Sequence, residues 1–363
     1  MKKNKNYVDL KDQPVPEGQH LLEVDDLKMY FHTEDGVVRA VDGVSYTLDR
    51  GETLGVVGES GSGKSVTAMT IMGLISMPPG KIEGGDVRYR GRSILEMTEE
   101  EMQHIRGNDI AMIFQDPMTS LNPVYKIGKQ VGEGLRLHRG YSKQEALKRA
   151  TELLDLVGIP EPEKRVNEYP HQFSGGMRQR VMIAMALACD PDILIADEPT
   201  TALDVTIQAQ IIELMQEMQE KNGNAIIMIT HDLGVVADMA DKIMVMYAGR
   251  PVEFGTAEEI FYESRHPYTW GLIRSIPEQA IEEKKPLTPI HGNPPSLMNL
   301  PEGCVFSPRC PYATDKCRKQ RPERVVTESG HYSACHYSGD PEFLKNAPAT
   351  SRTRKDSEKG GEA

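Results

Sequence analysis

One glycine-rich stretch constrains the fold of this chain more than any other: residues 53–69 read TLGVVGESGSGKSVTAM. An apolar run, of the kind that forms a buried strand, ends at this loop, and a stretch with helical character follows. Gly58, Gly63, Lys64 and Ser65 fit the pattern G-x-x-x-x-G-K-S, whose glycines let backbone N–H groups face phosphates. The N-terminus of the following helix adds a positive dipole at the same point. The stretch therefore predicts an α/β domain that binds a nucleotide by its phosphates.

The residues of this loop have separate expected roles. Lys64 would reach the β- and γ-phosphates, and the Ser65 hydroxyl would bind Mg²⁺. A chance glycine-rich turn is the alternative, but a strand before the loop and a helix after it argue against that interpretation. We expect the nucleotide to contact Gly58, Ser60, Gly61, Gly63, Lys64, Ser65 and Val66.

Polar side chains follow three further apolar runs that have the character of buried strands. The run ILIAD ends at Asp197 and is followed by Glu198, while Gln115 and His231 follow two other runs. The carboxyl ends of parallel strands meet at one edge of a sheet, so these residues predict a catalytic site there. Asp197 would hold Mg²⁺ through water, and Glu198 would polarise the attacking water. Taken alone, the two acids could instead cap a helix, and His231 could be a hydrogen-bonded core residue.

The composition fits such a domain and limits its partners. The 363 residues carry 54 acidic and 42 basic side chains, a net charge of −12. Proteins that bind nucleic acid generally carry a basic domain or stripe, so no nucleic acid is expected as a partner. The sequence contains no run of roughly eighteen apolar residues, the length that a membrane-spanning helix needs. The first residues also lack the apolar core of a signal peptide.

Changes of composition along the chain suggest the domain boundaries. The first residues are polar and include two prolines, whereas prolines and cysteines become frequent beyond about residue 268. We expect a flexible leader at 1–20, a nucleotide-binding domain at 21–277 with a helical insertion at about 121–180, a cysteine-bearing extension at 278–340, and a disordered tail at 341–363.

A second motif indicates the kind of nucleotide-binding domain. Residues 171–187 read HQFSGGMRQRVMIAMAL, which resembles the signature motif of ABC-type ATPases, centred on Ser174, Gly175 and Gly176. The motif lies between the glycine-rich loop and the two acids, where that family has it. It departs slightly at Met177, where the family often has glutamine. The resemblance covers about residues 21–277 and implies an α/β fold with a RecA-like core, an antiparallel β subdomain and a helical subdomain.

The resemblance also implies a mechanism. Two such domains enclose two ATP molecules, each bound by the glycine-rich loop of one domain and the signature of the other. Gln115 in FQDP would contact Mg²⁺ or the attacking water, and Asp204 ends the D-loop TALD. With Glu198, these landmarks and His231 in ITHD complete the expected site. An aromatic residue near the start of such domains stacks on adenine, and spacing favours Phe31 over Tyr30.

Three stretches resemble one class within this family, the ATPases of oligopeptide and dipeptide importers. They are QDPMTSLNP (115–123), RHPYTWGLIRSIP (265–277) and GNPPSLMNLPEGCVFSPRCP (292–311). The resemblance is to the D-type subunit, which pairs with a related F-type ATPase subunit. It implies two membrane permease subunits as partners, indirect work with an extracellular peptide-binding protein, and a peripheral position on the cytoplasmic face of a bacterial membrane.

Two alternatives are left open by the sequence. Close relatives of these importers move nickel or other small solutes, although their ATPases tend to lack a long cysteine-bearing extension. The chain could also be a non-hydrolysing structural half of an ATPase heterodimer. The presence of both Glu198 and His231 argues against that second alternative.

The extension holds four of the five cysteines: Cys304, Cys310, Cys317 and Cys335. Structural zinc sites favour C-x₂₋₄-C pairs, which this spacing lacks. Iron–sulfur clusters are commonly held by four thiolates, three of them often close in sequence. The importer ATPases that this segment resembles carry a [4Fe–4S] cluster on such cysteines, and Zn²⁺ is the alternative. Cys189 reads as a small buried apolar residue.

Either metal would act as a staple, because a proline-rich segment with few large apolar side chains has little core of its own. On this interpretation the extension folds around its metal, and the nucleotide-binding core folds without it. The sequence therefore predicts that ATP binding does not depend on the cysteines.

Overall fold

The computed structural model describes residues 10–11, 13–199, 205–276 and 289–348. The chain divides into two compact units. Unit 1 comprises Met1–Tyr30, Val41–Leu54 and Ser65–Ile229, and unit 2 comprises Phe31–Ala40, Gly55–Lys64 and Thr230–Ala363. Among the helices in the described part of the chain, none is both long and apolar enough to cross a membrane.

Three parallel strands form the centre of unit 1: β6 (Ile110–Ile113), β7 (Ile193–Asp197) and β8 (Ala225–Thr230). β7 pairs with β6 on one side and with β8 on the other, with Ile193 opposite both Ile110 and Ala225. Every residue of these strands is buried. Parallel strands covered on both faces read as continuous apolar runs, which is why the sequence pattern predicted them. Their shared direction brings the segments after β6 and β7 to the same edge.

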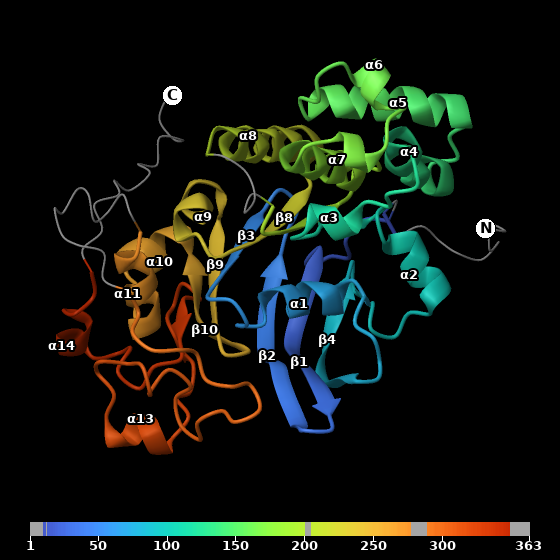
Figure 1. The fold of residues 1–363 in the computed structure, drawn as a ribbon. Helices are drawn as coiled ribbons and strands as arrows, with labels where there is room; N and C mark the ends of the chain where they lie inside the picture. Colours follow the sequence, from blue (N-terminus) through green and yellow to red (C-terminus); the bar gives the residue numbers. More distant parts are fainter. Residues whose placement is uncertain (1–9, 12, 200–204, 277–288, 349–363) are drawn as a thin grey trace, which may run out of the picture. The chain divides into compact units, whose positions relative to one another are not determined.

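Unit 1 also contains most of the helices in the described ranges. Figure 1 shows α4 to α7 gathered at one end of the unit, away from strands β1, β2 and β4. The segment expected to be a helical insertion, 121–180, contains α4, α5, α6, η1 and the start of α7. The bounds are α1 (Lys64–Ile71), α2 (Glu99–Ile105), α3 (Pro117–Ser120), α4 (Ile127–His138), α5 (Lys143–Leu156), α6 (Pro162–Arg165), η1 (Pro170–Gln172), α7 (Gly175–Leu187) and α8 (Val205–Asn222).

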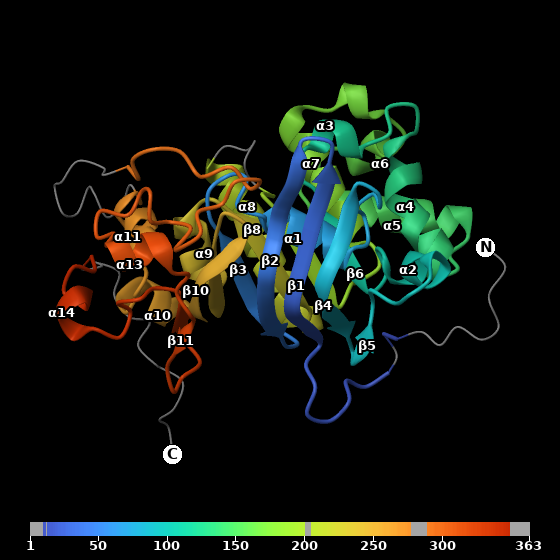
Figure 2. The ribbon, with the colours of Figure 1, turned by 90° about the horizontal axis from the view of Figure 1, so that it is seen from below.

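A separate four-stranded sheet has the strand order β2-β1-β4-β5. Figure 2 shows β2, β1 and β4 side by side. β4 and β5 pair in antiparallel fashion, with Tyr89 opposite Arg92. The strands are β1 (Leu22–Thr33), β2 (Gly36–Leu48), β4 (Gly80–Tyr89) and β5 (Arg92–Ser93).

Part of the expected leader has defined contacts with unit 1. Leu10 is only 1% exposed. The Lys11 ammonium donates to the backbone carbonyls of Asn108 at 3.2 Å and Cys189 at 3.1 Å. Carbonyls near the end of a helix lack intrahelical partners, so a lysine that reaches them stabilises that end. These contacts attach the described start of the chain near the C-terminus of α7.

A buried carboxylate, Asp192, connects the two sheets of unit 1 just before β7. It accepts hydrogen bonds from Tyr89 at 2.6 Å, from Arg90 at 2.5 Å and from Arg50 at 2.9 Å. Burial alone would raise the pKa of Asp192, but the hydrogen bonds from Tyr89 and Arg90 and the arginine charges together lower it. The folded state therefore favours the ionised carboxylate.

Replacing Asp192 by asparagine is expected to lower the free energy of unfolding by about 2 kcal/mol or more at neutral pH, because the buried Arg90 loses its counter-charge. The pKa of Asp192 is depressed by folding, so its stabilisation is present above the unfolded value of about 4 and is lost as pH falls through the folded value. Denaturant unfolding should thus show a difference between wild type and variant that shrinks in acid. The exposed neighbour Asp190, changed to asparagine, should shift stability by less than about 0.5 kcal/mol. An equal effect of the two substitutions would contradict this account.

Unit 2 is built around an antiparallel sheet. β9 (Lys242–Tyr247) pairs with β10 (Arg250–Thr256), β10 pairs with β12 (Tyr332–Ser333), and β12 pairs with β11 (Val325–Val326). The extension therefore adds two strands beside β10. The helices among its described residues are α9 (Leu233–Met239), α10 (Ala257–Tyr262), α11 (Pro267–Arg274), α13 (Asp315–Lys319) and α14 (Pro341–Leu344). Strand β3 (Thr53–Val57) leads into the glycine-rich loop.

A buried polar cluster fixes the extension to the rest of unit 2. Glu253 on β10 is fully buried and accepts hydrogen bonds from the backbone N–H of His266 at 3.2 Å and from the ring of His331 at 3.0 Å. Burial lowers the pKa of His266 to about 3, so its ring is neutral and accepts the backbone N–H of Tyr268 at 3.1 Å. Buried polar groups that satisfy one another in this way specify a single arrangement of the chain.

Candidate functional site

The glycine-rich loop in unit 2 has the backbone shape that phosphate binding requires. Gly58 and Gly63 have φ angles of 153° and 101°. A Cβ atom on Gly58 would lie 2.2 Å from the carbonyl oxygen of Met246, so no larger residue fits there. The Lys64 ammonium donates to the carbonyls of Gly58 at 2.6 Å and Glu59 at 3.0 Å. These bonds wrap the loop around the lysine, as a phosphate cradle requires.

The other expected residues of this motif vary in exposure. Ser60 and Gly61, at the tip of the loop, are exposed, whereas Ser65 and Val66 in the first turn of α1 are half-buried. The tip is therefore open to a ligand.

Two oxygen ligands suited to Mg²⁺ meet in unit 1. The Ser65 hydroxyl at the start of α1 donates to a carboxylate oxygen of Asp197, at the end of β7, at 3.0 Å. Asp197 is only 4% exposed, and an acid there fits a site for a cation. Mg²⁺ in such sites binds one or two protein oxygens together with waters and substrate phosphates. The pair fits that role, and the structure brings these two expected residues together.

The proposed catalytic acid is held at the end of the same strand. Gln115, which follows β6, donates through Nε2 to a carboxylate oxygen of Glu198 at 2.9 Å. Glu198 has a φ of 47°, in the left-handed region, and its backbone N–H donates to the carbonyl of Ile229 at 2.9 Å. Left-handed conformations of residues other than glycine concentrate at functional sites. Glu198 is half-buried and Gln115 is exposed, so water can reach both side chains.

The remaining expected residues of the nucleotide site differ in exposure and contacts. His231 is exposed in unit 2, directly after β8. Phe31 is half-buried near the end of β1. Tyr30 is the alternative to Phe31 for stacking on adenine. Its hydroxyl donates a hydrogen bond to Asp42 at 2.9 Å, which holds the tyrosine side chain in place. Asp204 lies outside the described residues.

The signature motif forms an open helix N-terminus in unit 1. Ser174 is the N-cap of α7, and its hydroxyl accepts the backbone N–H of Met177 at 3.3 Å. Ser174 and Gly175 are exposed, Gly176 is half-buried, and no described atom lies within 4 Å of a Cβ built on Gly175. The first N–H groups of a helix lack intrahelical partners and attract anions. This end of α7 can accept a phosphate from outside the unit.

The four cysteines of the extension come together. Cys304, Cys310, Cys317 and Cys335 all line one small cavity of about 20 Å³ in unit 2. The Cys304 backbone N–H donates to the carbonyl of Cys317 at 2.8 Å. Burial raises the pKa of Cys310 to about 11 and that of Cys335 to about 12. Without a metal to displace the protons, these thiols would be neutral at physiological pH.

The chemistry of these donors allows a metal centre, with different geometry for each metal. The raised pKa values of Cys310 and Cys335 mean that metal binding would release protons. No three His, Cys, Asp or Glu side chains in the described ranges are placed to hold one metal ion. A single zinc would need its four sulfurs within about 3.8 Å of one another, from Zn–S bonds of about 2.3 Å. Four cysteines around one cavity supply the donor set of a [4Fe–4S] cluster, and the same four residues would hold it.

Residues 41–201 match the family described as "ABC transporter", and residues 252–317 match "Oligopeptide/dipeptide transporter, C-terminal region". The chain is 58% identical over 312 residues to the oligopeptide transport ATP-binding protein OppD of Bacillus subtilis (strain 168), covering 86% of this chain and 87% of that protein. It belongs to the family of ABC-type oligopeptide and dipeptide transport ATP-binding proteins.

Further relatives agree with this assignment. The chain is 52% identical over 320 residues to the dipeptide transport ATP-binding protein DppD of Escherichia coli (strain K12), covering 88% of this chain and 97% of that protein. Its fold matches the solved structure of a dimeric ATP-binding cassette in a post-hydrolysis state bound to ADP and Pi, with a TM-score of 0.60 and 29% identity. That match covers 65% of this chain and 98% of the other. The ABC ATPase fold predicted from the sequence is confirmed.

Two contacts in this chain could not be predicted from the sequence. Arg309 of the extension forms an ion pair with Glu59 of the glycine-rich loop, although 250 positions separate them. The Tyr268 hydroxyl accepts the backbone N–H of the same Glu59 at 2.9 Å. One sign of this contact is visible in the sequence. Glu59 is an acidic residue inside a loop expected to bind phosphates, and its negative charge there needs a positively charged partner.

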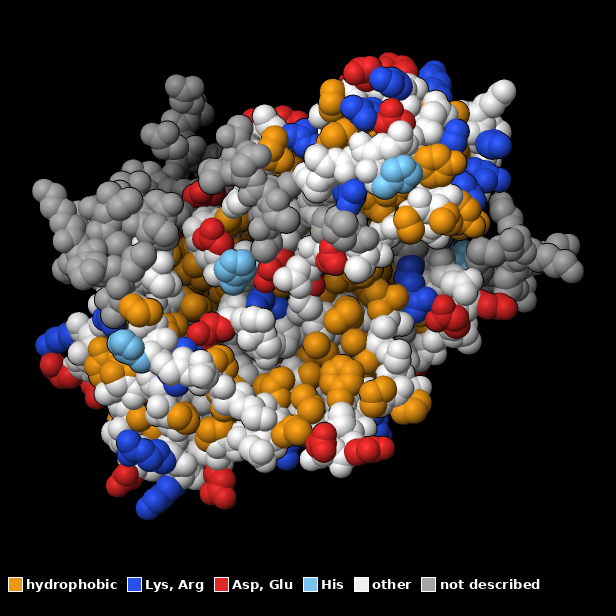
Figure 3. All heavy atoms as spheres, viewed as in Figure 1, with side chains coloured by type: hydrophobic (Ala, Val, Ile, Leu, Met, Phe, Trp, Pro, Cys, Tyr) orange, Lys and Arg blue, Asp and Glu red, His pale blue; other side chains and the backbone are white. Residues whose placement is uncertain are grey.

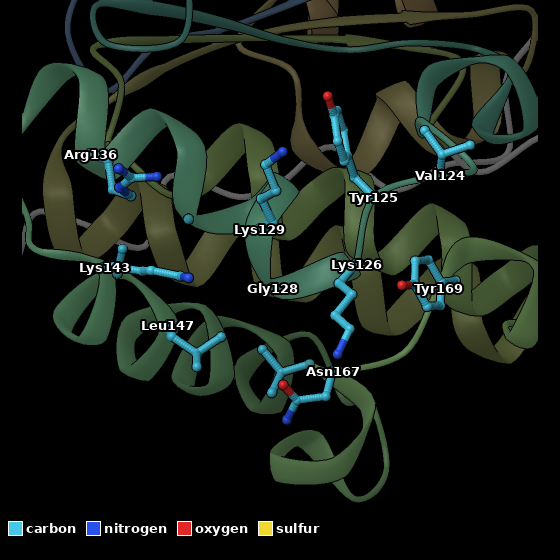
Figure 4. A pocket seen from close by; sticks show the side chains of 13 residues that line it. Val124, Tyr125, Lys126, Gly128, Lys129, Arg136, Lys143, Leu147, Asn167 and Tyr169 are labelled. Carbon is cyan, nitrogen blue, oxygen red and sulfur yellow. The ribbon is translucent and has the colours of Figure 1, made fainter.

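A hollow of about 740 Å³ lies between α4 and α5 in unit 1, and Figure 4 shows its walls. None of the expected site residues lines it. On the face drawn in Figure 3, hydrophobic side chains and basic side chains occur together over these helices. Among the described residues that line the hollow there is no carboxylate, so its charge favours an anionic occupant. Its basic and larger apolar side chains are Lys126, Lys129, Arg136, Lys143, Val124, Tyr125, Leu147, Val166 and Tyr169.

Proposed function

We propose that this protein binds and hydrolyses ATP at an interface shared with a second ATPase subunit, and that this reaction powers the import of oligopeptides or dipeptides. The observation that carries the proposal is the combination of a complete set of ATP motifs with an extension of the oligopeptide/dipeptide transporter type on one chain. Import of nickel or another small solute is the less favoured alternative, because the four-cysteine extension is intact.

The chain's own residues account for binding of the nucleotide. The amides of the glycine-rich loop and the Lys64 ammonium bind the phosphates, and Phe31 stacks on adenine. Ser65 and Asp197, with Gln115 just after β6, would hold Mg²⁺, which neutralises charge on the phosphates when bound. Lys64 is only 5% exposed, so its charge acts in a site with little water.

Glu198 is the proposed general base. Gln115 orients its carboxylate, and Glu198 polarises the water that attacks the γ-phosphate and accepts its proton. His231 contributes as a further polar group after β8. The hydrogen bond between Gln115 and Glu198 supports the interpretation of a hydrolysing subunit over that of a purely structural half.

A second ATPase subunit completes each site. The open N-terminus of α7, with Ser174, Gly175 and Gly176, can bind the γ-phosphate of a nucleotide held by the partner. We propose that the partner is the homologous F-type subunit, because the relatives of this chain resemble the D-type member of such pairs. Asp204 would lie at the same interface by its place in the D-loop.

The membrane partners would dock on unit 1. An apolar hollow of about 540 Å³ is lined by Leu74, Met112, Phe114, Met182 and Met185, among others. Leu74 and Phe114 are 41% and 38% exposed. Methionines adapt to the shape of a partner. Phe114 directly precedes Gln115, which orients Glu198. A permease segment bound in this hollow would therefore influence the position of Gln115.

This docking places the protein on the cytoplasmic face of a bacterial membrane, beneath two permease subunits. An extracellular peptide-binding protein would deliver the peptide to those subunits and would not contact this chain. Closure of the two ATPase subunits on ATP and their reopening after hydrolysis would then drive the permeases.

The four cysteines of the extension are proposed to hold a [4Fe–4S] cluster, with Zn²⁺ as the alternative. Support comes from the small cavity that all four cysteines line. When bound, the cluster would supply four covalent links across a segment with little core of its own. Its role is proposed to be structural.

The function is tested by reconstitution with its partners. The protein alone should hydrolyse ATP slowly, and turnover should rise in vesicles that contain the F-type subunit, both permeases and the peptide-binding protein. Uptake of a labelled peptide should require ATP. Fast hydrolysis by the isolated subunit, independent of its concentration, would contradict the shared site. Uptake of nickel but not of peptides would overturn the proposed substrate.

A further inference from the structure

A bidentate ion pair joins the glycine-rich loop to the cysteine-bearing extension. Arg309 donates through Nη1 to one carboxylate oxygen of Glu59 at 2.6 Å, and through Nη2 to the other at 3.0 Å. The arginine side chain is 4% exposed and the glutamate side chain 30%. Paired, parallel hydrogen bonds between guanidinium and carboxylate are strong and fix orientation as well as distance. Both residues belong to unit 2.

The extension holds the arginine firmly. Arg309 Nε donates to the carbonyl of His291 at 2.9 Å, and Nη2 donates to the carbonyl of Ile290 at 3.1 Å. Its Nη1 also reaches the Tyr247 hydroxyl at 3.3 Å. A side chain bound at this many points has no freedom to swing away, so Glu59 has a rigid partner.

Glu59 is anchored by its backbone too. Its N–H donates to the Tyr268 hydroxyl at 2.9 Å, and its carbonyl accepts from the Lys64 ammonium at 3.0 Å. Phe306 packs against the Tyr268 ring with a centroid distance of 5.3 Å, and Phe306 also lines the cavity of the cysteines. The cysteine segment therefore reaches the loop by two routes, through Arg309 and through Phe306.

We propose that Arg309 is a positioning residue for ATP, which neutralises Glu59 and holds the glycine-rich loop in its phosphate-binding shape. The proposal rests on the proposed function, because it concerns the same nucleotide site. A carboxylate within a loop that receives a triphosphate opposes binding unless a cation balances it. Arg309 provides that cation from the extension, next to Cys310. Correct folding of the cysteine segment thus becomes a condition for tight ATP binding.

The test uses the full chain and separates charge from shape. Arg309→Met should raise the Kd of a fluorescent ATP analogue, and the KM for ATP, about tenfold, with a much smaller change in kcat. Adding Glu59→Gln to this variant should restore affinity to within about threefold of wild type, because the unbalanced charge is gone. The loss in Arg309→Met should also shrink at high salt, which screens repulsion. The control Arg318→Met, which removes an exposed arginine of the same extension, should bind like wild type.

Each outcome has a clear meaning. Unchanged affinity in Arg309→Met would overturn the proposal, and so would an equal loss with and without Glu59→Gln, since that would indicate a purely structural effect. If Arg309→Met does not fold, the affinity for the ATP analogue is measured instead for Arg309→Lys, which keeps the positive charge but loses the paired hydrogen bonds. This variant should lose less affinity than tenfold, and a loss larger than that would also overturn the proposal. Failure of the wild-type protein to bind the analogue would instead count against the proposed function.

Discussion

Replacing Glu198 by glutamine is expected to lower the rate of ATP hydrolysis by the reconstituted transporter at least about 100-fold, because glutamine cannot accept a proton from water. The amide has nearly the same shape and can still accept the hydrogen bond that Gln115 donates at 2.9 Å. Phosphate binding depends on other residues, so the Kd of ATP should stay within about threefold of wild type. With binding retained and hydrolysis blocked, the two ATPase subunits should accumulate as a closed dimer with ATP.

The measurements are steady-state hydrolysis, nucleotide binding and size-exclusion chromatography with ATP. The matched control is Glu213→Gln, which changes an exposed glutamate of α8 and should leave all three unchanged. Near-normal turnover by the Glu198→Gln complex would mean that hydrolysis takes place in the other site. The subunit would then be the non-hydrolysing half of the pair.

Replacing Cys310 by serine is expected to abolish binding of the iron–sulfur cluster, because a serine hydroxyl is a poor substitute for a thiolate ligand. Wild-type protein prepared without oxygen should be brown and contain iron and sulfide, whereas the variant should be colourless. The segment from about residue 294 to 337 should become sensitive to protease, since the remaining core there is small. Absorption spectra, metal analysis and limited proteolysis check these three expectations.

The control for this experiment is Cys189→Ala, which changes a buried cysteine of unit 1 that lies apart from the four in sequence and should leave the metal content unchanged. If the wild-type protein is colourless and contains one zinc per chain, the metal that crosslinks the extension is zinc and not an iron–sulfur cluster. Wild-type protein without any metal, and with a protease-resistant extension, would contradict both.

The cysteine variant also tests an expectation from the sequence that the structure leads us to revise. Sequence reasoning treated the extension as independent of ATP binding. Arg309 is adjacent to Cys310, and its ion pair with Glu59 now predicts that Cys310→Ser weakens ATP binding as well. A variant without metal that binds ATP with unchanged affinity would contradict this dependence and agree with the prediction made from the sequence.

Local patterns were enough to predict the parts of the site that follow strands. β7 is a continuous apolar run, so its end at Asp197 could be read directly, and Glu198 and Gln115 followed from the same rule. The parallel pairing of β6 with β7 then brings Gln115 close to Glu198. The glycine-rich loop was equally predictable, because the lack of space at Gly58 requires a glycine there, and the sequence shows that glycine directly.

Contacts between distant segments could not be predicted in this way. Nothing periodic relates Lys11 to the carbonyl of Cys189, or Glu59 to Arg309. Such pairs depend on how loops cross after the strands and helices have packed. The choice between Phe31 and Tyr30 was open for a similar reason, since only the structure reveals that Asp42 binds the tyrosine hydroxyl. The division of the chain into domains and the roles of the site residues stay predictions.

The pairing of β12 with β10 has a practical consequence for shortened versions of the protein. Residues 332–333 cover part of one side of β10, and the outermost strand, β11, is only two residues long. A chain cut before residue 325 would uncover the backbone donors and acceptors of β10, and such bare edges invite strands from other molecules. Truncation at the apparent end of the nucleotide-binding domain should therefore yield a protein that aggregates, and an expression boundary is better placed after residue 348.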